Sequence, residues 1–183
     1  MNRAILEAER AHLARLLEAV QRCVFFLDAS DKKLSWPLQA EELQHRKRDV
    51  DLFESLAAIN ERFAKLQDTL GSAMRHAALL AGEPVDSFLK VLSFYEKCGV
   101  IDSMEAWQLY RTARNLAAHE YETDYAAIAE HFNLLHELLP ALYRDAANFV
   151  RYCSQTLGIE PETQDYAADF SNIIQKKGSV PFS

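Results

Sequence analysis

The sequence is poor in the residues that interrupt a regular backbone, with five glycines and five prolines among 183 positions. So few breaks favour long helices joined by short connections. Cysteine is scarce as well, because Cys23, Cys98 and Cys153 are the only three and lie far apart in the sequence. They fit neither a disulfide framework nor a zinc site. We therefore expect a reducing, cytoplasmic setting and no bound metal.

Long apolar runs are also missing. No run of about 18 apolar residues occurs, so we expect no membrane-spanning helix. The first residues, MNRAILEAERAHLARLL, are interleaved with charges and lack the apolar stretch of a signal peptide. Neither a glycine-rich phosphate loop nor a Gly-x-Ser-x-Gly motif is present, and we expect no cofactor.

Basic residues are outnumbered by acidic ones. Twenty Lys and Arg against 27 Asp and Glu give a formal net charge of −7. This balance argues against nonspecific coating of nucleic acid, which needs a broad basic face, but it leaves room for a small basic pocket. Two local basic groups exist: HRKR at 45–48, which we interpret as a solvated helix face, and Arg111 with Arg114.

The apolar residues that are present recur at helical spacing, without the alternation of strands. The sequence therefore predicts an all-α fold, an antiparallel bundle of about five helices. One apolar stripe runs from Ile5 to Leu27. A single helix over 38–81 would be roughly 66 Å long, too long for a compact domain of this size. We expect it to break where Asp51 can cap a new helix and Glu54 can reach back to it.

Further helix start and stop signals divide the rest of the chain. The expected helix ends are Gly82, Gly99 and Gly158, and the expected starts are Pro84 with Asp86, Asp102 with Glu105, and Thr123 or Asp124. Pro140 is expected to kink the long last helix of the bundle. We expect one helical domain over 1–157, followed by a C-terminal tail over 158–183 with one short helix around 166–175.

The most specific pattern is ARNLAAHEYETD at 113–124. At about 100° per residue, Arg114 and His119 would point about 140° apart on a regular helix. Two arrangements would bring them together. The helix ends or loosens near His119, or two copies pack across a two-fold axis so that each arginine meets the other copy's histidine. Asn115 precedes the histidine by four residues and can brace its imidazole.

These residues resemble a known family. ARNLAAHEY matches the Arg-x4-His-x-Tyr motif of HEPN domains, in the HepT-like toxin branch. Upstream, the run 99–103 before Trp107, Arg111 and Arg114 is similar to that branch's glycine and two aliphatic residues ahead of the motif helix. The resemblance covers roughly residues 1–157, and only the motif is specific within it. The tail has no counterpart in the compact members of the family.

The resemblance implies a function. HEPN toxins are metal-independent endoribonucleases that act on RNA as homodimers, with the motifs of both protomers facing one another. Their usual partner is a nucleotidyltransferase antitoxin. In the HepT-like branch this antitoxin adenylylates the motif tyrosine, which corresponds to Tyr121 here.

The chemistry of the side chains supports those roles. Cleaving RNA without metal needs a base for the 2′-hydroxyl, and an imidazole with an ordinary pKa of about 6.5 suits neutral pH. It also needs fixed positive charge at the phosphate, which a guanidinium supplies bidentately. His119 and Arg114 are therefore the candidate catalytic residues, with Asn115 and Arg111 in support. A nucleotide attached to Tyr121 would block RNA entry.

Two other interpretations stay open. The chain could be a non-catalytic HEPN subunit that binds or regulates a nucleotidyltransferase, or a structural helical protein in which the motif is a coincidence. The remaining histidines are interpreted as packing or surface residues: His12, His45, His76, His131 and His136. Neither HEYET nor HELLP places a second histidine four residues after the first, as a zinc protease motif requires.

Overall fold

The computed structural model describes residues 3–115 and 123–178, and every regular element in these ranges is helical. The helices are α1 (Arg3–Asp31), α2 (Ala40–His45), α3 (Val50–Leu80), α4 (Phe88–Lys97), α5 (Met104–Asn115), α6 (Tyr125–Tyr152) and α7 (Ala167–Gly178), and a π-helical turn (Cys153–Leu157) follows α6. The expected all-α fold is confirmed. The described ranges hold seven α-helices: α7 is the short helix expected in the tail, and the other six exceed the expected bundle of about five by one.

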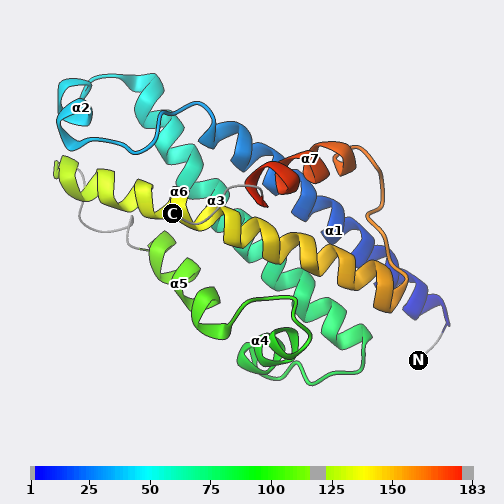
Figure 1. Cartoon of the computed structure of the whole chain (residues 1–183). Helices are drawn as coiled ribbons and strands as arrows, with labels where there is room; N and C mark the ends of the chain where they lie inside the picture. The colour runs from blue at the N-terminus through cyan, green and yellow to red at the C-terminus, as the bar shows by residue number, and fades with distance from the viewer. Residues whose placement is uncertain (1–2, 116–122, 179–183) are drawn as a thin grey trace.

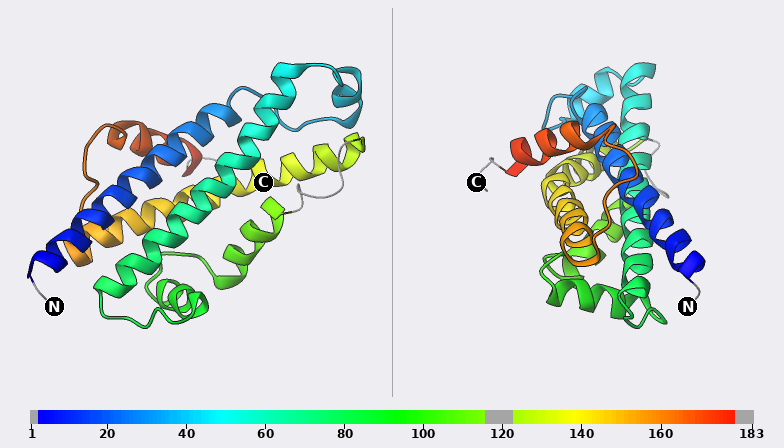
Figure 2. Two further views of the ribbon diagram at one scale, coloured as in Figure 1. Left: turned by 180° about the vertical axis from the view of Figure 1, so that it is seen from behind. Right: turned by 90° about the vertical axis from the view of Figure 1, so that its right-hand side faces the viewer.

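The long helices α1, α3 and α6 form the body of the molecule (Figure 1). α3 packs against α1, α4, α5 and α6, while α6 also contacts α1, α2, α5 and α7. Figure 2 shows the short helices α4 and α5 on one side of this body and α7 on the other. α6 runs through Pro140 without interruption. The helices α3 and α6 therefore position α5, which carries the first half of the motif.

The apolar stripe of α1 explains its burial. Five of its aliphatic residues recur every three or four positions and are fully buried: Leu13, Leu17, Val20, Val24 and Leu27. The expected stripe began earlier, at Ile5, but Ile5 and Leu6 are 51% and 37% exposed. The apolar spacing thus extends toward the N-terminus beyond the buried part of α1, and the first two turns carry apolar residues that are exposed to solvent.

The start of α3 corrects one expected cap. Asp49, not Asp51, precedes the helix, and its side-chain oxygen accepts a hydrogen bond of 3.0 Å from the backbone N–H of Leu52. That bond and the guanidinium of Arg46 lower the pKa of the Asp49 carboxyl. Asp51 lies inside the first turn, where its charge still complements the positive end of the helix dipole.

Two further starts also differ from expectation, and one agrees with it. Ser87 caps α4 and Ser103 caps α5, each accepting from a backbone N–H two or three residues later. Asp86 and Asp102 were expected there, but they lie one residue too early for this geometry. Asp124 caps α6 as expected, accepting from two backbone N–H groups at 3.1 Å.

The expected helix ends are confirmed. Gly82, Gly99 and Gly158 have φ values of 80°, 68° and 61°, which non-glycine residues rarely adopt. At the last of these, Nη2 of Arg10 on α1 donates at 3.0 Å to the carbonyls of Leu157 and Gly158. The chain segment that leaves the bundle at Gly158 is therefore hydrogen-bonded to α1.

The tail contains the expected short helix, α7. It contacts α1 and α6, and its residues Phe170 and Ile173 are buried in the hydrophobic core. Within residues 3–115 and 123–178, no helix is both long enough and apolar enough to cross a bilayer.

Candidate functional site

The site begins with the way α5 is held. Trp107, Tyr110 and Ala113 form its buried face. The Nε2 of Gln67 on α3 donates at 3.1 Å to the Trp107 carbonyl, and the Tyr110 hydroxyl donates at 3.0 Å to Oδ2 of Asp145 on α6. Because α5 is fixed to helices on two sides, the position of its last turn is fixed as well.

That last turn carries three of the predicted site residues. Arg111 and Asn115 are exposed, and Arg114 is partly buried. On a helix, Arg111, Arg114 and Asn115 fall within a sector of about 100°, so they share one face at the C-terminal end of α5. The structure therefore brings both arginines and the asparagine together, next to the carbonyl end of the helix dipole, which a cation complements.

Arg114 is anchored to α3. Its Nη1 donates at 3.1 Å to the backbone carbonyl of Ala64 and at 2.6 Å to Oδ1 of Asp68. Its side chain is only 17% exposed, whereas that of Asp68 is 65% exposed. In the described part of the chain both hydrogen bonds use Nη1, so Nε and Nη2 remain for a further acceptor. This pairing was not predicted from the sequence, because 46 residues separate the two side chains.

The charge at this end of α5 is mixed. Two guanidinium groups are present, but Asp68 touches one of them, and the exposed Glu61 lies seven residues before Asp68 on the same face of α3. Arg111 is the more accessible cation, and no described carboxylate lies within ion-pair distance of it. An anion at this site would meet the Arg111 guanidinium and the outer edge of Arg114.

The other half of the motif, His119 and Tyr121, falls outside the described residues. The chain is described again from Thr123, and Asp124 opens α6, which packs against α5. The motif sequence thus joins two packed helices, with Arg114 on the first. The proposed parts of His119 and Tyr121 stay predictions.

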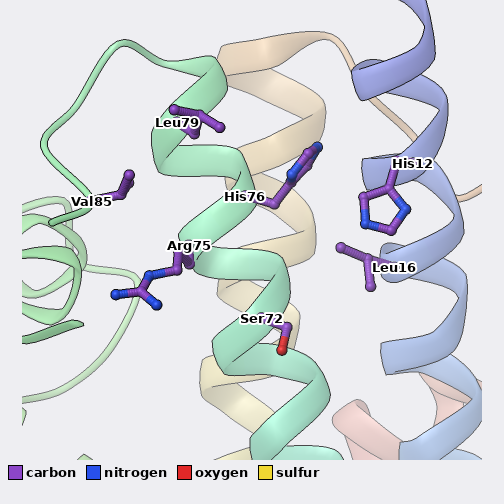
Figure 3. Close-up of a pocket in the computed structure, with 7 residues that line it drawn as sticks. All are labelled: His12, Leu16, Ser72, Arg75, His76, Leu79 and Val85. Carbon is purple, nitrogen blue, oxygen red and sulfur yellow. The ribbon is translucent and has the colours of Figure 1, made fainter. Parts of the chain in front are cut away.

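A concave region lies beside α3, toward the start of α1 (Figure 3). It has a volume of about 510 Å³. His12 and His76 face one another there with ring centroids 4.8 Å apart, and Arg75 points to the other side of α3. Nε2 of His76 lies 3.0 Å from the carbonyl of Glu9 and 3.3 Å from its carboxylate. Both rings therefore have packing or pairing partners, in agreement with the interpretation from sequence.

One buried cluster of charged and polar side chains was not predicted from the sequence. Asp31 at the end of α1 is 2% exposed, and its carboxylate meets Nδ1 of His136 at 2.6 Å and Nζ of Lys177 at 3.1 Å. The ring of Trp36 stacks on His136 at 4.3 Å, and its Nε1 donates to the Asp31 carbonyl. Three helices meet at this carboxylate. Its partners lie 105 and 146 positions away, so no local pattern could reveal them.

Among the residues that the structure describes, no group of three or more His, Cys, Asp and Glu side chains is placed to hold a metal ion. Comparison with known protein families, with characterised proteins and with solved structures finds no match for this chain.

Proposed function

We propose that this protein is a metal-independent endoribonuclease of the HEPN type, which acts as a homodimer in a toxin–antitoxin pair. Its nucleotidyltransferase antitoxin silences it by adenylylating Tyr121. The observation that carries this proposal is the last turn of α5, where Arg111, Arg114 and Asn115 share one face immediately ahead of His119 in the sequence.

The reaction follows from these side chains. His119 takes the proton of a ribose 2′-hydroxyl, the 2′-oxygen attacks the adjacent phosphorus, and the bond from phosphorus to the 5′-oxygen breaks. The leaving 5′-oxygen takes a proton from the partner subunit's His119. The products are a 2′,3′-cyclic phosphate and a 5′-hydroxyl. Arg111 and Arg114 stabilise the negative charge that builds up on the phosphate oxygens, and Asn115 positions the imidazole.

The anchoring of Arg114 supports this role. A guanidinium held by the Ala64 carbonyl and Asp68 loses little conformational entropy when it binds a phosphate. Such fixed donors contribute more to catalysis than mobile ones, because they are oriented before charge develops. Nε and Nη2 are adjacent on the guanidinium plane and are suited to two parallel hydrogen bonds.

The dimer and the antitoxin belong to the same proposal. On a regular helix Arg114 and His119 would diverge by about 140°, so a second copy would complete the site by bringing its own histidine. Adenylylation of Tyr121 would place a bulky anion beside the two arginines. It would compete with RNA phosphate for the same cations.

Two observations favour a second candidate, a non-catalytic HEPN subunit that binds or regulates a nucleotidyltransferase. The Asp68 carboxylate already neutralises part of the charge of Arg114, and the chain as a whole carries −7. Both features disfavour the approach of RNA. A subunit that binds another protein instead of RNA does not need to attract a polyanion.

The deciding experiment is RNA cleavage by the purified protein in EDTA, with the product ends identified by mass spectrometry. We expect cleavage to survive EDTA and to leave 2′,3′-cyclic phosphates. His119→Ala and Arg114→Ala should each reduce the rate by about 10²- to 10⁴-fold. Arg48→Ala is the matched control, because Arg48 is an exposed arginine far from α5 in the sequence.

The contrary result is equally clear. If protein with unmodified Tyr121 cleaves no RNA, while a co-expressed nucleotidyltransferase binds it stably, the non-catalytic subunit is the better description. Cleavage that persists in both His119→Ala and Arg114→Ala would assign the activity to other residues. Sedimentation showing a fully active monomer at micromolar concentration would exclude a site shared between two copies.

A further inference from the structure

A small basic pocket lies between α1 and α3. Its volume is about 200 Å³, and its lining residues are Arg22, Cys23 and Phe26 of α1 with Arg62 and Lys65 of α3. We call it the α1–α3 basic pocket. Among the described residues, no acidic side chain lines it. Three cations thus surround one small space in a chain whose formal net charge is −7.

The cations of this pocket are arranged around an aromatic ring. The guanidinium carbon of Arg22 lies 5.0 Å from the centroid of the Phe26 ring, and that of Arg62 lies 5.5 Å from it. Both distances are within the range of cation–π contacts. Nη1 of Arg62 also donates to the Phe26 carbonyl at 3.1 Å and to the hydroxyl of Ser30. These contacts hold the charged groups in place without neutralising them.

The cations of the pocket have no ion-pair partner in the part of the chain that the structure describes. Within residues 3–115 and 123–178, no carboxylate lies within 4.0 Å of the cationic nitrogens of Arg22, Arg62 or Lys65. Other basic residues of the chain, such as Arg46 and Arg114, do have such partners. Three like charges that converge without a counter-charge repel one another, and a bound anion would relieve that repulsion.

Cys23 in the same pocket is a reporter rather than a nucleophile. It is half-buried, and its thiol lies 3.9 Å from the hydroxyl of Thr69. Burial raises the pKa of this thiol despite the nearby Lys65 and Arg22, so it stays protonated at neutral pH and reacts slowly. A ligand in the pocket would cover it further.

We propose that the α1–α3 basic pocket binds a phosphate group, as inorganic phosphate or as the phosphate of a small phosphomonoester. Two guanidinium groups and an ammonium match the charge and the several acceptor oxygens of a phosphate dianion. A volume of about 200 Å³ corresponds to roughly seven water molecules at about 30 Å³ each. It holds a phosphate, while the rest of an ester would lie outside.

This pocket is separate from the last turn of α5. Arg62 and Lys65 line it from the α1 side of α3, whereas Ala64 and Asp68 of the same helix contact Arg114. The protein can therefore bind phosphate at this place whether or not it cleaves RNA.

The test is protection of Cys23 from iodoacetamide, followed by peptide mass spectrometry. The exposed Cys98 in the same molecule is the internal reference. The probes are inorganic phosphate and a ribonucleoside 5′-monophosphate, with chloride at equal ionic strength. We expect the labelling rate of Cys23 to fall by a factor of 1 + [L]/Kd, about tenfold at nine times Kd, while the rate at Cys98 stays constant.

Variants connect this protection to the cations. Arg22 and Lys65 are both exposed, so Arg22→Gln combined with Lys65→Gln should fold normally and lose at least tenfold in phosphate affinity. Because these changes also alter the thiol, the ratio of rates with and without phosphate is compared within each variant. Arg75→Gln is the control, since Arg75 is an exposed arginine of α3 that does not line the pocket.

Three results would overturn the inference. The first is a labelling rate of Cys23 that neither phosphate probe changes at 20-fold excess over physiological millimolar levels. The second is protection by phosphate that is as strong in the double variant as in the parent. The third is protection by an RNA oligonucleotide without terminal phosphates when both small probes have no effect. That outcome would assign the pocket to the RNA backbone instead.

Discussion

Asp68 of α3 and Arg114 of α5 form an ion pair, with Oδ1 of the first 2.6 Å from Nη1 of the second. Asp68 stays largely in solvent, while Arg114 is mostly covered. The carboxylate thus does two things to the predicted catalytic arginine: it fixes the guanidinium, and it offsets part of its charge. Substitutions can separate these two effects.

Asp68→Asn keeps an acceptor for Nη1 and removes the negative charge. If the site cleaves RNA, we expect KM for RNA to fall about two- to fivefold with little change in kcat, because exposed charge pairs contribute about 0.5–1 kcal/mol. Asp68→Leu should lower kcat, since it releases the anchored guanidinium. Steady-state kinetics at two salt concentrations measures both. Glu61→Gln removes a charge from the same face of α3 and should leave kcat unchanged; equal kinetics for all three variants would contradict the role of the pair.

The carboxyl of Asp145 should make stability depend on pH. Burial raises its pKa to about 7, and the Tyr110 hydroxyl is its partner. In the unfolded chain the pKa is about 3.9. The folded protein therefore holds the proton more tightly, and the stabilisation present below about pH 4 is lost as the pH rises through 7. The shift corresponds to about 4 kcal/mol.

Asp145→Asn removes this titration and keeps an acceptor for Tyr110. We expect the variant to be more stable than the parent at pH 8 and similar to it at pH 4, as measured by urea denaturation at both values. Asp169→Asn, an exposed position on α7, is the control for a lost surface charge. A parent and a variant with the same pH slope would show that Asp145 ionises normally.

Asp31 should be the most sensitive charge in the core. Its carboxylate is buried and meets both His136 and Lys177. Removing one partner from a buried ion pair costs about 3–5 kcal/mol, because the remaining charge is left uncompensated. We expect Asp31→Leu to destabilise the protein by an amount in this range and to speed amide hydrogen exchange in α7 more than in α3. A loss below 1 kcal/mol would mean that the cluster is not a stabilising contact.

The three cysteines should react in a fixed order. Cys98 is exposed, Cys23 is half-buried, and Cys153 is fully buried with a pKa that burial raises to about 12. Since the thiolate is the reactive form, iodoacetamide should modify Cys98 first, Cys23 later, and Cys153 only after unfolding. Mass spectrometry over time measures the order. In guanidinium, which unfolds the protein, the three cysteines should react at similar rates. Early modification of Cys153 would contradict the packing of α6.

The fold was open to prediction because helical periodicity is a local property. The stripe from Leu13 to Leu27 repeats every three or four residues, and that spacing alone indicates a buried helix face. Caps were harder to assign, because serine and aspartate serve equally well and stood next to each other at Asp102 and Ser103. Only the backbone geometry decides between such neighbours.

The site was open to prediction only in part. The placement of Arg111 and Asn115 on one turn follows from their spacing and the helical pattern. The contact between Arg114 and Asp68 does not, because it depends on how two helices pack. The same holds for the basic pocket, whose residues come from two helices about 40 positions apart in the sequence. Periodicity tells which face is buried, but it does not tell which helix covers it.

The docking of α7 has a consequence for where this chain can be shortened. Lys177, near the end of that helix, neutralises Asp31 at the end of the first one, and Phe170 fills part of the same core. A chain cut at residue 157 would keep every helix of the predicted bundle, yet it would open an apolar strip along α1 and α6 to water. It would also remove Lys177, one of the two side chains that contact the Asp31 carboxylate. Such a fragment would be prone to self-association through the uncovered strip. α7 therefore covers apolar residues of α1 and α6 that would otherwise be exposed.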